Sequence, residues 1–312
     1  MSTPSASLPS PVSWREWLLT SEPQSRRQAR LGRYYRGWLA FSRNPSAMFG
    51  LAIVLMLVLC AVFAPWIAPY DPERTLGLQT ARLLPPSAQN WLGTDIQGFD
   101  VFSRLINGSR FTLMAIFIVA IITTPIGLLI GTFSGYYGGI VDAVFMRITD
   151  VFLAFPRLVL AMALVGARGP GLENAIFAIS VTAWPAYARI ARAETLTIRN
   201  NDYIAAIRLQ GASSLRIIFG HIIPLCLSSV IVRVTLDMAG IIIVVAGLGF
   251  LGIGAQPPTP EWGTMVSAAK DQMRDYPWII TSAGLAICVV SLGFNLLGDG
   301  LRDVLDPKSA RN

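Results

Sequence analysis

Long apolar runs recur along this chain, and they constrain its fold more than any other feature of the sequence. Several of them reach the roughly 20 residues that a helix needs to cross the hydrocarbon core of a bilayer. Of the 312 residues, 53% are hydrophobic and 14% are charged, whereas a soluble domain typically carries about 25% charged residues. The sequence therefore predicts an all-α membrane protein that crosses the bilayer several times.

We expect six transmembrane helices with both chain ends in the cytoplasm, because arginines gather at the N-terminus and in one long internal loop. The expected spans lie at about 48–66, 112–136, 142–165, 172–190, 225–251 and 276–298. They divide the chain into an arginine-rich cytoplasmic segment, a first helix with an external loop, a five-helix core and a cytoplasmic tail, at 1–47, 48–111, 112–300 and 301–312. Within the first segment, residues 14–18 form either a short interfacial helix or part of an irregular tail.

Several chemistries are excluded by what the chain lacks. Its three cysteines each stand alone within or beside an apolar run, so neither disulfides nor thiolate metal sites are expected. Neither lysine follows a glycine, so the chain has no P-loop, and any ATP that drives it must be hydrolysed by another polypeptide. The single histidine, His221, has no carboxylate at helical spacing, so we expect a capping or partner contact there. We predict no catalytic residue, no metal site and no cofactor in this chain, and no nucleic acid as a partner.

One polar stretch, 191–224, separates two apolar runs and must lie outside the hydrocarbon. Asp202 suits an N-cap, and Tyr203 and Ile207 lie on one apolar face of the helix that would follow. Gly211 is suited to end that helix, since glycine adopts positive φ at low cost. A second short helix at 215–223 would lead to the next span. Spacing alone leaves open whether this loop is an amphipathic linker or a functional surface.

Glycines and charges within the spans complete the pattern. Gly127, Gly131 and Gly135 recur every four residues and predict a smooth stripe for close helix packing. Arg233 and Asp237 lie four residues apart on one face of the fifth expected span, so they can form an ion pair. That pair either has only a structural role, with each charge neutralising the other, or lines a path for a solute and meets a zwitterionic one. Arg157 is a third candidate for such a path, or it extends its side chain towards the interface.

Four separated motifs resemble the permeases of binding-protein-dependent ABC importers. The first lies in the polar loop and consists of Ala205-Ala206, Gly211 and Pro224, with Ile204 where the family has a glutamate. In the external loop, LGTDIQGFDVFSRLINGSR matches the family pattern, with Phe99 where an arginine is usual. QPPTPEWG at 256–263 and the tail GDGLRDVLDPK also match. The resemblance is to the C-type subunit of the oligopeptide, dipeptide and nickel class, with a type I importer architecture.

This resemblance implies a bacterial inner-membrane subunit that is not itself an enzyme. Its implied partners are a related permease subunit, two cytoplasmic ATPases that bind ATP and magnesium, an external solute-binding protein and membrane lipid. It assigns contact with the ATPases to one surface: Asp202, Tyr203, Ile204, Ala205, Ala206, Ile207, Arg208, Gly211 and Ala212. Short peptides are the expected solute, with nickel or metal chelates, opines and glutathione as alternatives. An ion-coupled secondary carrier is a further alternative, although the sequence shows no internal repeat.

Overall fold

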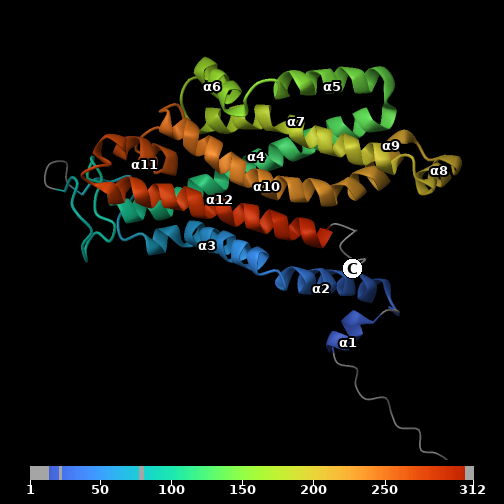
Figure 1. The fold of residues 1–312 in the computed structure, drawn as a ribbon, viewed down its shortest axis with the longest axis horizontal. Coiled ribbons are helices and arrows are strands. Elements are labelled where there is room, and N and C mark those ends of the chain that lie inside the picture. The colour runs from blue at the N-terminus through green and yellow to red at the C-terminus, as the bar shows by residue number, and fades with distance from the viewer. Residues whose placement is uncertain (1–13, 21–22, 77–80, 306–312) are drawn as a thin grey trace, which may run out of the picture.

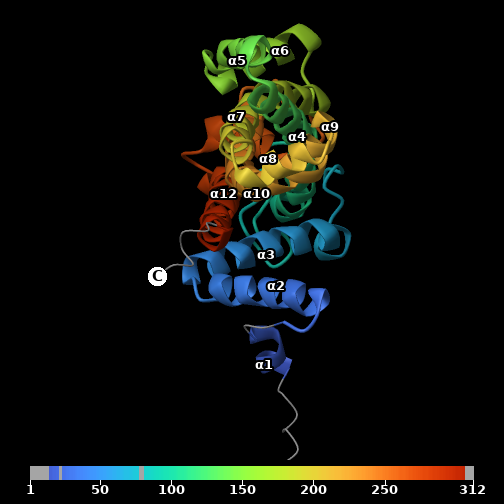
Figure 2. The ribbon, with the colours of Figure 1, turned by 90° about the vertical axis from the view of Figure 1, so that its right-hand side faces the viewer.

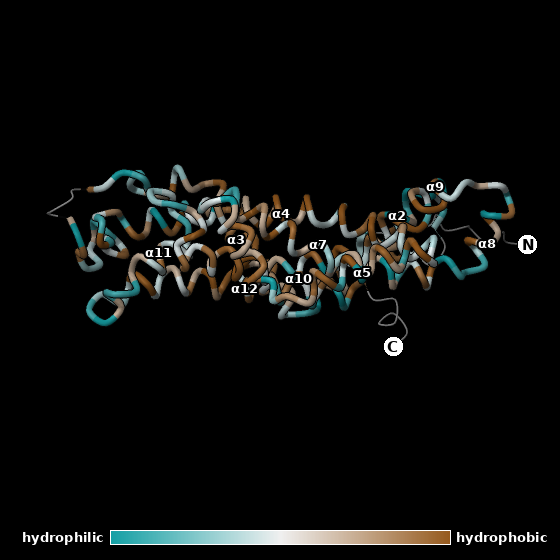
Figure 3. The backbone as a smooth tube through the Cα atoms, turned by 90° about the horizontal axis from the view of Figure 1, so that it is seen from above, coloured by the Kyte–Doolittle hydropathy of each residue, from teal (hydrophilic) through white to brown (hydrophobic). Residues whose placement is uncertain are grey.

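The computed structural model describes residues 14–20, 23–76 and 81–305, and every named element within these ranges is a helix (Figure 1). The long helices run beside one another along the long axis of the molecule (Figures 1 and 2). Helix α11 lies at one end of this bundle, and α8 and α9 lie at the other. We call these the α11 end and the α8 end. Hydrophobic residues dominate the middle, while hydrophilic ones gather at the two ends (Figure 3).

The described chain forms the following elements in order: α1 Trp14–Leu19, α2 Arg26–Ser42, α3 Pro45–Ile67, α4 Val101–Tyr137, α5 Gly139–Leu153, α6 Arg157–Arg168, α7 Leu172–Ile198, α8 Asp202–Leu209, α9 Ser214–Ile217, the π-helical turn η1 Ile218–Ile222, α10 Ile223–Phe250, α11 Trp262–Ala269, the 3₁₀ turn η2 Lys270–Gln272 and α12 Pro277–Leu305. The all-α prediction is confirmed. Local signals set several of the helix starts: the Asn44 side chain caps α3, which begins at a proline, and the Asp100 side chain caps α4.

Four of the described helices are long and apolar enough to cross a membrane: α3, α4, α12 and the continuous run from Ser214 to Phe250. The bent pair α5 and α6 passes the same criterion when it is counted as one span. The predicted spans at 48–66 and 112–136 fall within α3 and α4, and those at 225–251 and 276–298 each extend one residue beyond the matching helix. Helix α4 is much longer than expected, since it begins at Val101 rather than near residue 112.

The predicted third span, 142–165, is not one continuous helix. The chain turns by 88° between α5 and α6, so this segment is either a broken span or a re-entrant loop. Pro156 occupies the N-cap position of α6, immediately after the break. A proline has no backbone N–H and restricts the residue before it to extended conformations, so a helix cannot continue smoothly through this point.

Helix α7 covers the predicted fourth span at 172–190 and continues to Ile198, but it is less apolar than the other long helices. Its position in the bundle accounts for this composition. It packs against α4, α5, α6 and α10, so much of its surface faces protein. A helix enclosed by other helices does not need an apolar side chain at every position.

The glycine stripe of α4 packs directly against α7, as the four-residue spacing predicted. A Cβ atom at Gly127 would lie 2.4 Å from the Cβ of Tyr187, and one at Gly131 would lie 2.3 Å from the backbone oxygen of Ala188. At Gly135, a Cβ would come within 2.8 Å of Thr195. The two backbones approach so closely that no side chain fits between them.

Other local details differ from the sequence analysis. The helix expected at 215–223 does not end before Pro224, because α9, η1 and α10 form one continuous helical run. Residues 14–18 are helical, within α1. Most of the expected tail at 301–312 lies outside the described residues, since α12 is described only as far as Leu305. The first 13 residues of the expected cytoplasmic segment also lie outside them.

We expect Gly131→Ala to destabilise the protein by about 1–3 kcal/mol, because the added methyl group cannot fit against α7. Alanine is otherwise the better helix former by about 1 kcal/mol. Gly166→Ala in α6 is the matched control, since a Cβ there would meet nothing within 4 Å. Thermal unfolding in detergent should show a lower midpoint for the first variant and an equal or higher midpoint for the second. Equal midpoints for both would contradict the close contact.

Candidate functional site

The α8 loop, residues 199–213, projects from the α8 end between α7 and α9 (Figure 1). Asn201 occupies the N-cap position of α8, and Asp202 is the first helical residue rather than the cap that we predicted. Gly211 follows the helix with φ of +82°, which confirms its predicted role at the turn. Ser213 then caps α9, with its side chain accepting from the backbone N–H of Arg216.

Ile204 anchors this loop to the bundle. It is 0% exposed and packs in a cluster with Ile198 of α7, Ile222 of η1 and Cys226 of α10. Burial of an unpaired carboxylate at such a position would be costly. An apolar side chain therefore suits this environment, where the resembling family usually has a glutamate.

Polar contacts hold the loop at two further points. The hydroxyl of Tyr203 lies 2.6 Å from Nδ1 of His221, so the single histidine, in η1, contacts the α8 loop directly. Arg199 donates from Nη1 to the backbone oxygens of Gly135 and Tyr136, at 2.6 and 3.2 Å. These oxygens belong to the last residues of α4, where a cation satisfies free carbonyls and complements the helix dipole.

The opposite face of α8 is exposed. Leu209 is 90% exposed, and Tyr203, Ala205, Ala206 and Arg208 are also exposed. The loop is thus a firmly anchored helix that presents small, apolar and cationic side chains outward. Such a surface can bind another protein.

A partly buried carboxylate organises a second site, where α6, α7 and α10 meet. Oδ1 of Asp237 on α10 lies 3.0 Å from Nη1 of Arg157, and Oδ2 accepts a hydrogen bond of 2.9 Å from the Tyr187 hydroxyl. Arg233, the partner that helical spacing predicted, is only a second cation at 3.9 Å. We call these four residues the central cluster.

The structure therefore brings together all three path residues that we predicted, and adds Tyr187. No sequence signal could have linked Tyr187 to Asp237, because they are 50 residues apart on different helices. Arg157 does not extend away from the bundle, since its guanidinium is held against α10. Two other ion pairs also join distant helices: Arg192 of α7 binds Asp142 of α5, and Arg189 of α7 binds Asp150 of α5.

At the α11 end, Asp95 and Arg104 lie close together below the surface. The guanidinium of Arg104 stacks over the Phe99 ring at 4.3 Å, and its Nε lies 3.9 Å from Oδ2 of Asp95. Burial raises the pKa of Asp95, while hydrogen bonds from the Phe99 and Gln97 backbone and the charge of Arg104 act in the opposite direction. The phenylalanine found in place of the family's usual arginine therefore covers a cation.

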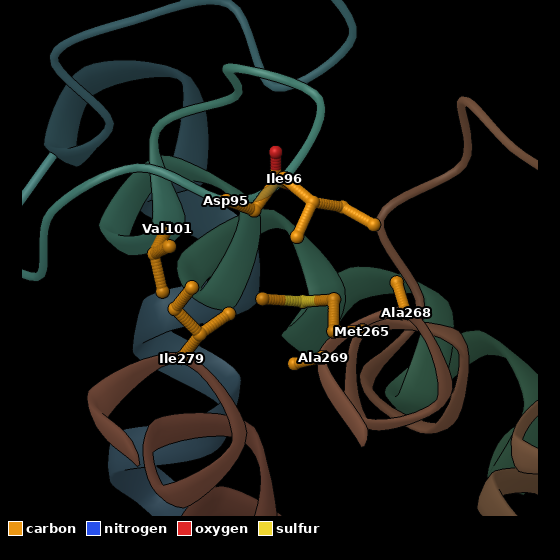
Figure 4. Close-up of a pocket in the computed structure, with 7 residues that line it drawn as sticks. All are labelled: Asp95, Ile96, Val101, Met265, Ala268, Ala269 and Ile279. Carbon is orange, nitrogen blue, oxygen red and sulfur yellow. The ribbon is translucent and has the colours of Figure 1, made fainter. Parts of the chain in front are cut away.

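A small cavity lies beside Asp95, with Met265 and Ile279 among its lining side chains (Figure 4). Its volume of about 10 Å³ admits no more than about one water molecule. This cavity is therefore a packing defect of the α11 end, too small for an organic solute. Within the described residues, no group of three or more histidine, cysteine, aspartate or glutamate side chains could hold a metal ion.

Glu261 is a buried acidic residue whose environment the sequence analysis did not predict. It is 1% exposed and caps α11, accepting hydrogen bonds of 2.9 Å from the backbone N–H groups of Gly263 and Thr264. Burial raises the pKa of this carboxyl from an ordinary 4.5 to about 7, although the two N–H groups act to lower it. No local pattern in the sequence marks this burial.

Comparison with known proteins gives two family matches. Residues 127–311 match the binding-protein-dependent transport system inner membrane component, and residues 34–86 match the N-terminal transmembrane domain of oligopeptide transport permease C. The chain is 44% identical to the di/tripeptide transport system permease protein of Pseudomonas aeruginosa, over 87% of this chain and 91% of that one. It is 42% identical to a probable D,D-dipeptide transport system permease protein of Escherichia coli, over 93% of this chain and 96% of that one.

Two further similarities bear on solute and fold. A glutathione transport system permease protein of Escherichia coli is 42% identical, over 88% of this chain and 90% of that one. Among solved structures, an inward-facing MetNI methionine ABC transporter superposes with a TM-score of 0.54 at 19% identity, covering 64% of this chain and 96% of the matched chain. At that identity the likeness concerns the fold alone.

We expect the stability of the protein to fall as pH rises from about 4.5 to about 7, through Glu261. Its pKa is higher in the native state than in the unfolded chain, so between these values the native state binds more protons and loses stability as pH increases. Across this pH range the free energy of unfolding should fall by roughly 3 kcal/mol because of Glu261. Glu261→Gln removes this pH dependence, which unfolding in detergent at several pH values measures. Glu173→Gln, at an exposed glutamate in α7, is the control; an unchanged profile in the Glu261 variant would refute the assignment.

Proposed function

Because this chain belongs to the family of binding-protein-dependent transport system inner membrane components, we propose that it carries short peptides across the bacterial inner membrane as one permease subunit of an ATP-driven importer. Its location in the inner membrane follows from the family and from the several apolar helices. The similarity to di/tripeptide and D,D-dipeptide permeases over most of both chains is the observation that favours peptides.

In this proposal the chain crosses the membrane six times, with both ends in the cytoplasm. The six crossings are the four long apolar helices, the bent pair α5–α6, and α7, which is shielded by its neighbours. The α8 end faces the cytoplasm. Several arginines near that end support this orientation, since cytoplasmic segments are enriched in positive charge: Arg192, Arg199, Arg208 and Arg216.

The α8 loop is the docking surface for two cytoplasmic ATPases in this scheme. ATP and magnesium bind those partner chains, and this chain contributes no catalytic residue. The loop suits the role because Ile204, Tyr203 and Arg199 tie it to three helices, so a displacement of α8 reaches the bundle rather than being absorbed by a slack linker. A related permease subunit and an external solute-binding protein complete the complex.

The central cluster lies on the path of the solute. Its charged side chains are held at the break between α5 and α6 and against α10, and charged groups within a membrane bundle commonly mark such routes. Glutathione is the second candidate solute, because a glutathione permease is as similar to this chain as the D,D-dipeptide permease is.

Reconstitution tests the function directly. The chain is co-expressed with the permease, ATPase and solute-binding genes beside it, purified as a complex and placed in vesicles. We expect uptake of labelled dipeptides that requires ATP and the binding protein, with glutathione, nickel and an opine as competing solutes. Uptake driven by an ion gradient without ATP would instead favour a secondary carrier, and failure of the ATPases to co-purify would refute the proposal.

We expect Leu209→Ala to weaken binding of the ATPases about tenfold, which corresponds to roughly 1.4 kcal/mol for the loss of one central apolar contact. Leu209 is almost fully exposed and makes little contribution to the fold, so the thermal midpoint of the isolated chain should not change. Leu285→Ala, at an exposed leucine of α12, is the control. Binding is measured by titration of the ATPases onto the permease pair in nanodiscs; equal affinity for both variants would contradict the docking role of α8.

A further inference from the structure

The central cluster contains more hydrogen-bond donors than its single carboxylate can satisfy. Both oxygens of Asp237 are already engaged, Oδ1 by Arg157 and Oδ2 by Tyr187. Within the part of the chain that the structure describes, three buried nitrogens have no hydrogen-bond partner: Nε and Nη2 of Arg157, and Nε of Arg233. Unpaired donors are expensive inside a membrane protein, so their presence indicates a role for an additional acceptor.

The cluster also has an uncompensated positive charge, because two arginines surround one aspartate. Exposure decides which charge a solute would meet. The Arg157 and Arg233 side chains are 25% and 39% exposed, whereas that of Asp237 is 10% exposed. The aspartate therefore lies behind its partners, and the accessible side of the cluster is cationic.

Two backbone features adjoin the cluster. Arg157 begins α6, whose first N–H groups have no partner within the helix and which no side chain caps. Across from it, Gly240 presents no side chain, and a Cβ there would lie 3.6 Å from Asp237 and 3.8 Å from Arg157. The cluster thus adjoins a helix start, which favours negative charge, and a bare stretch of α10.

Other acidic groups nearby are engaged elsewhere. Glu194 of α7 accepts a hydrogen bond of 2.7 Å from Ser229, one turn from Arg233 on α10, and forms no ion pair with Arg233. Asp150 binds Arg189. Among the described residues, Asp237 is the only carboxylate that pairs with Arg157 or Arg233.

We propose that Arg157 and Arg233 bind the C-terminal carboxylate of the transported peptide, with Asp237 and Tyr187 as positioning residues that hold Arg157 in place. This inference rests on the proposed function and deepens it. It replaces the earlier expectation that the oppositely charged Arg233 and Asp237 meet the two ends of a zwitterion, because both Asp237 oxygens already have a partner and its side chain is the least exposed of the three charged groups.

A cycle of variants and substrates tests the proposal in the reconstituted complex. The peptides are Ala-Phe, its C-terminal amide and its N-acetyl form, each used above its dissociation constant for the binding protein, as determined by calorimetry. The permease variants are Arg157→Gln, Arg157→Lys, Arg233→Gln and the control Arg168→Gln, at the other end of α6. ATP-dependent uptake is measured for every combination.

We expect Arg157→Gln to reduce the uptake of Ala-Phe and of its N-acetyl form about tenfold or more, as for the loss of a charge-assisted hydrogen bond. Uptake of the amide should fall less than about threefold, since it has no carboxylate to lose. Arg233→Gln should show the same selectivity among the three peptides. Arg157→Lys should retain more uptake of Ala-Phe than Arg157→Gln does. Arg168→Gln should leave the uptake of all three peptides unchanged.

The outcomes separate this inference from the function on which it rests. If the complex assembles and imports Ala-Phe, but each variant reduces the uptake of all three peptides equally, the carboxylate site is wrong. The proposed importer function is then unaffected. If the native complex imports no peptide with ATP, the proposed function itself fails. Should Arg157→Gln not assemble, Arg233→Gln decides the question, because that side chain makes no hydrogen bond to Asp237 within the cluster and is the more exposed of the two.

Discussion

The close contact between α4 and α7 is the constraint on which most of the structure depends. Three glycines on α4 let the backbone of α7 approach until no side chain fits between them. This contact fixes the position of Tyr187, Arg189 and Arg192, all of which reach other helices from α7. Without the glycines, α7 would be displaced, and the partners of these side chains would be out of reach.

Charged side chains connect the bent segment α5–α6 to the rest of the bundle. Asp142 and Asp150 of α5 bind arginines of α7, and Arg157 of α6 binds Asp237 of α10. Each bond joins residues far apart in the chain, and most of the other exposed side chains of α5 are apolar. Since partly buried charges are costly to leave alone, these pairs favour one arrangement of the segment over others.

Much of the candidate site was predictable from the sequence, because its signals are local. Gly211 adopts the positive φ that the turn after α8 requires, and the glycine spacing of α4 marks a packing face. Pro156 at the break is a local signal too, since a proline disfavours a continuous helix. The partner of Asp237 was not predictable: helical spacing favoured Arg233, while the shorter ion pair comes from Arg157, 80 residues away.

The sequence by itself determined a helical membrane protein, the family to which it belongs, the approximate apolar spans and a short surface helix followed by a glycine turn, since each of these follows from composition, local motifs or neighbouring residues. Only the tertiary structure decided which charges pair, that Glu261 and Ile204 are buried, and that the central cluster has spare cationic donors. The physical reason is distance along the chain. Pairing and burial depend on side chains from separate helices, and no local pattern encodes how those helices meet.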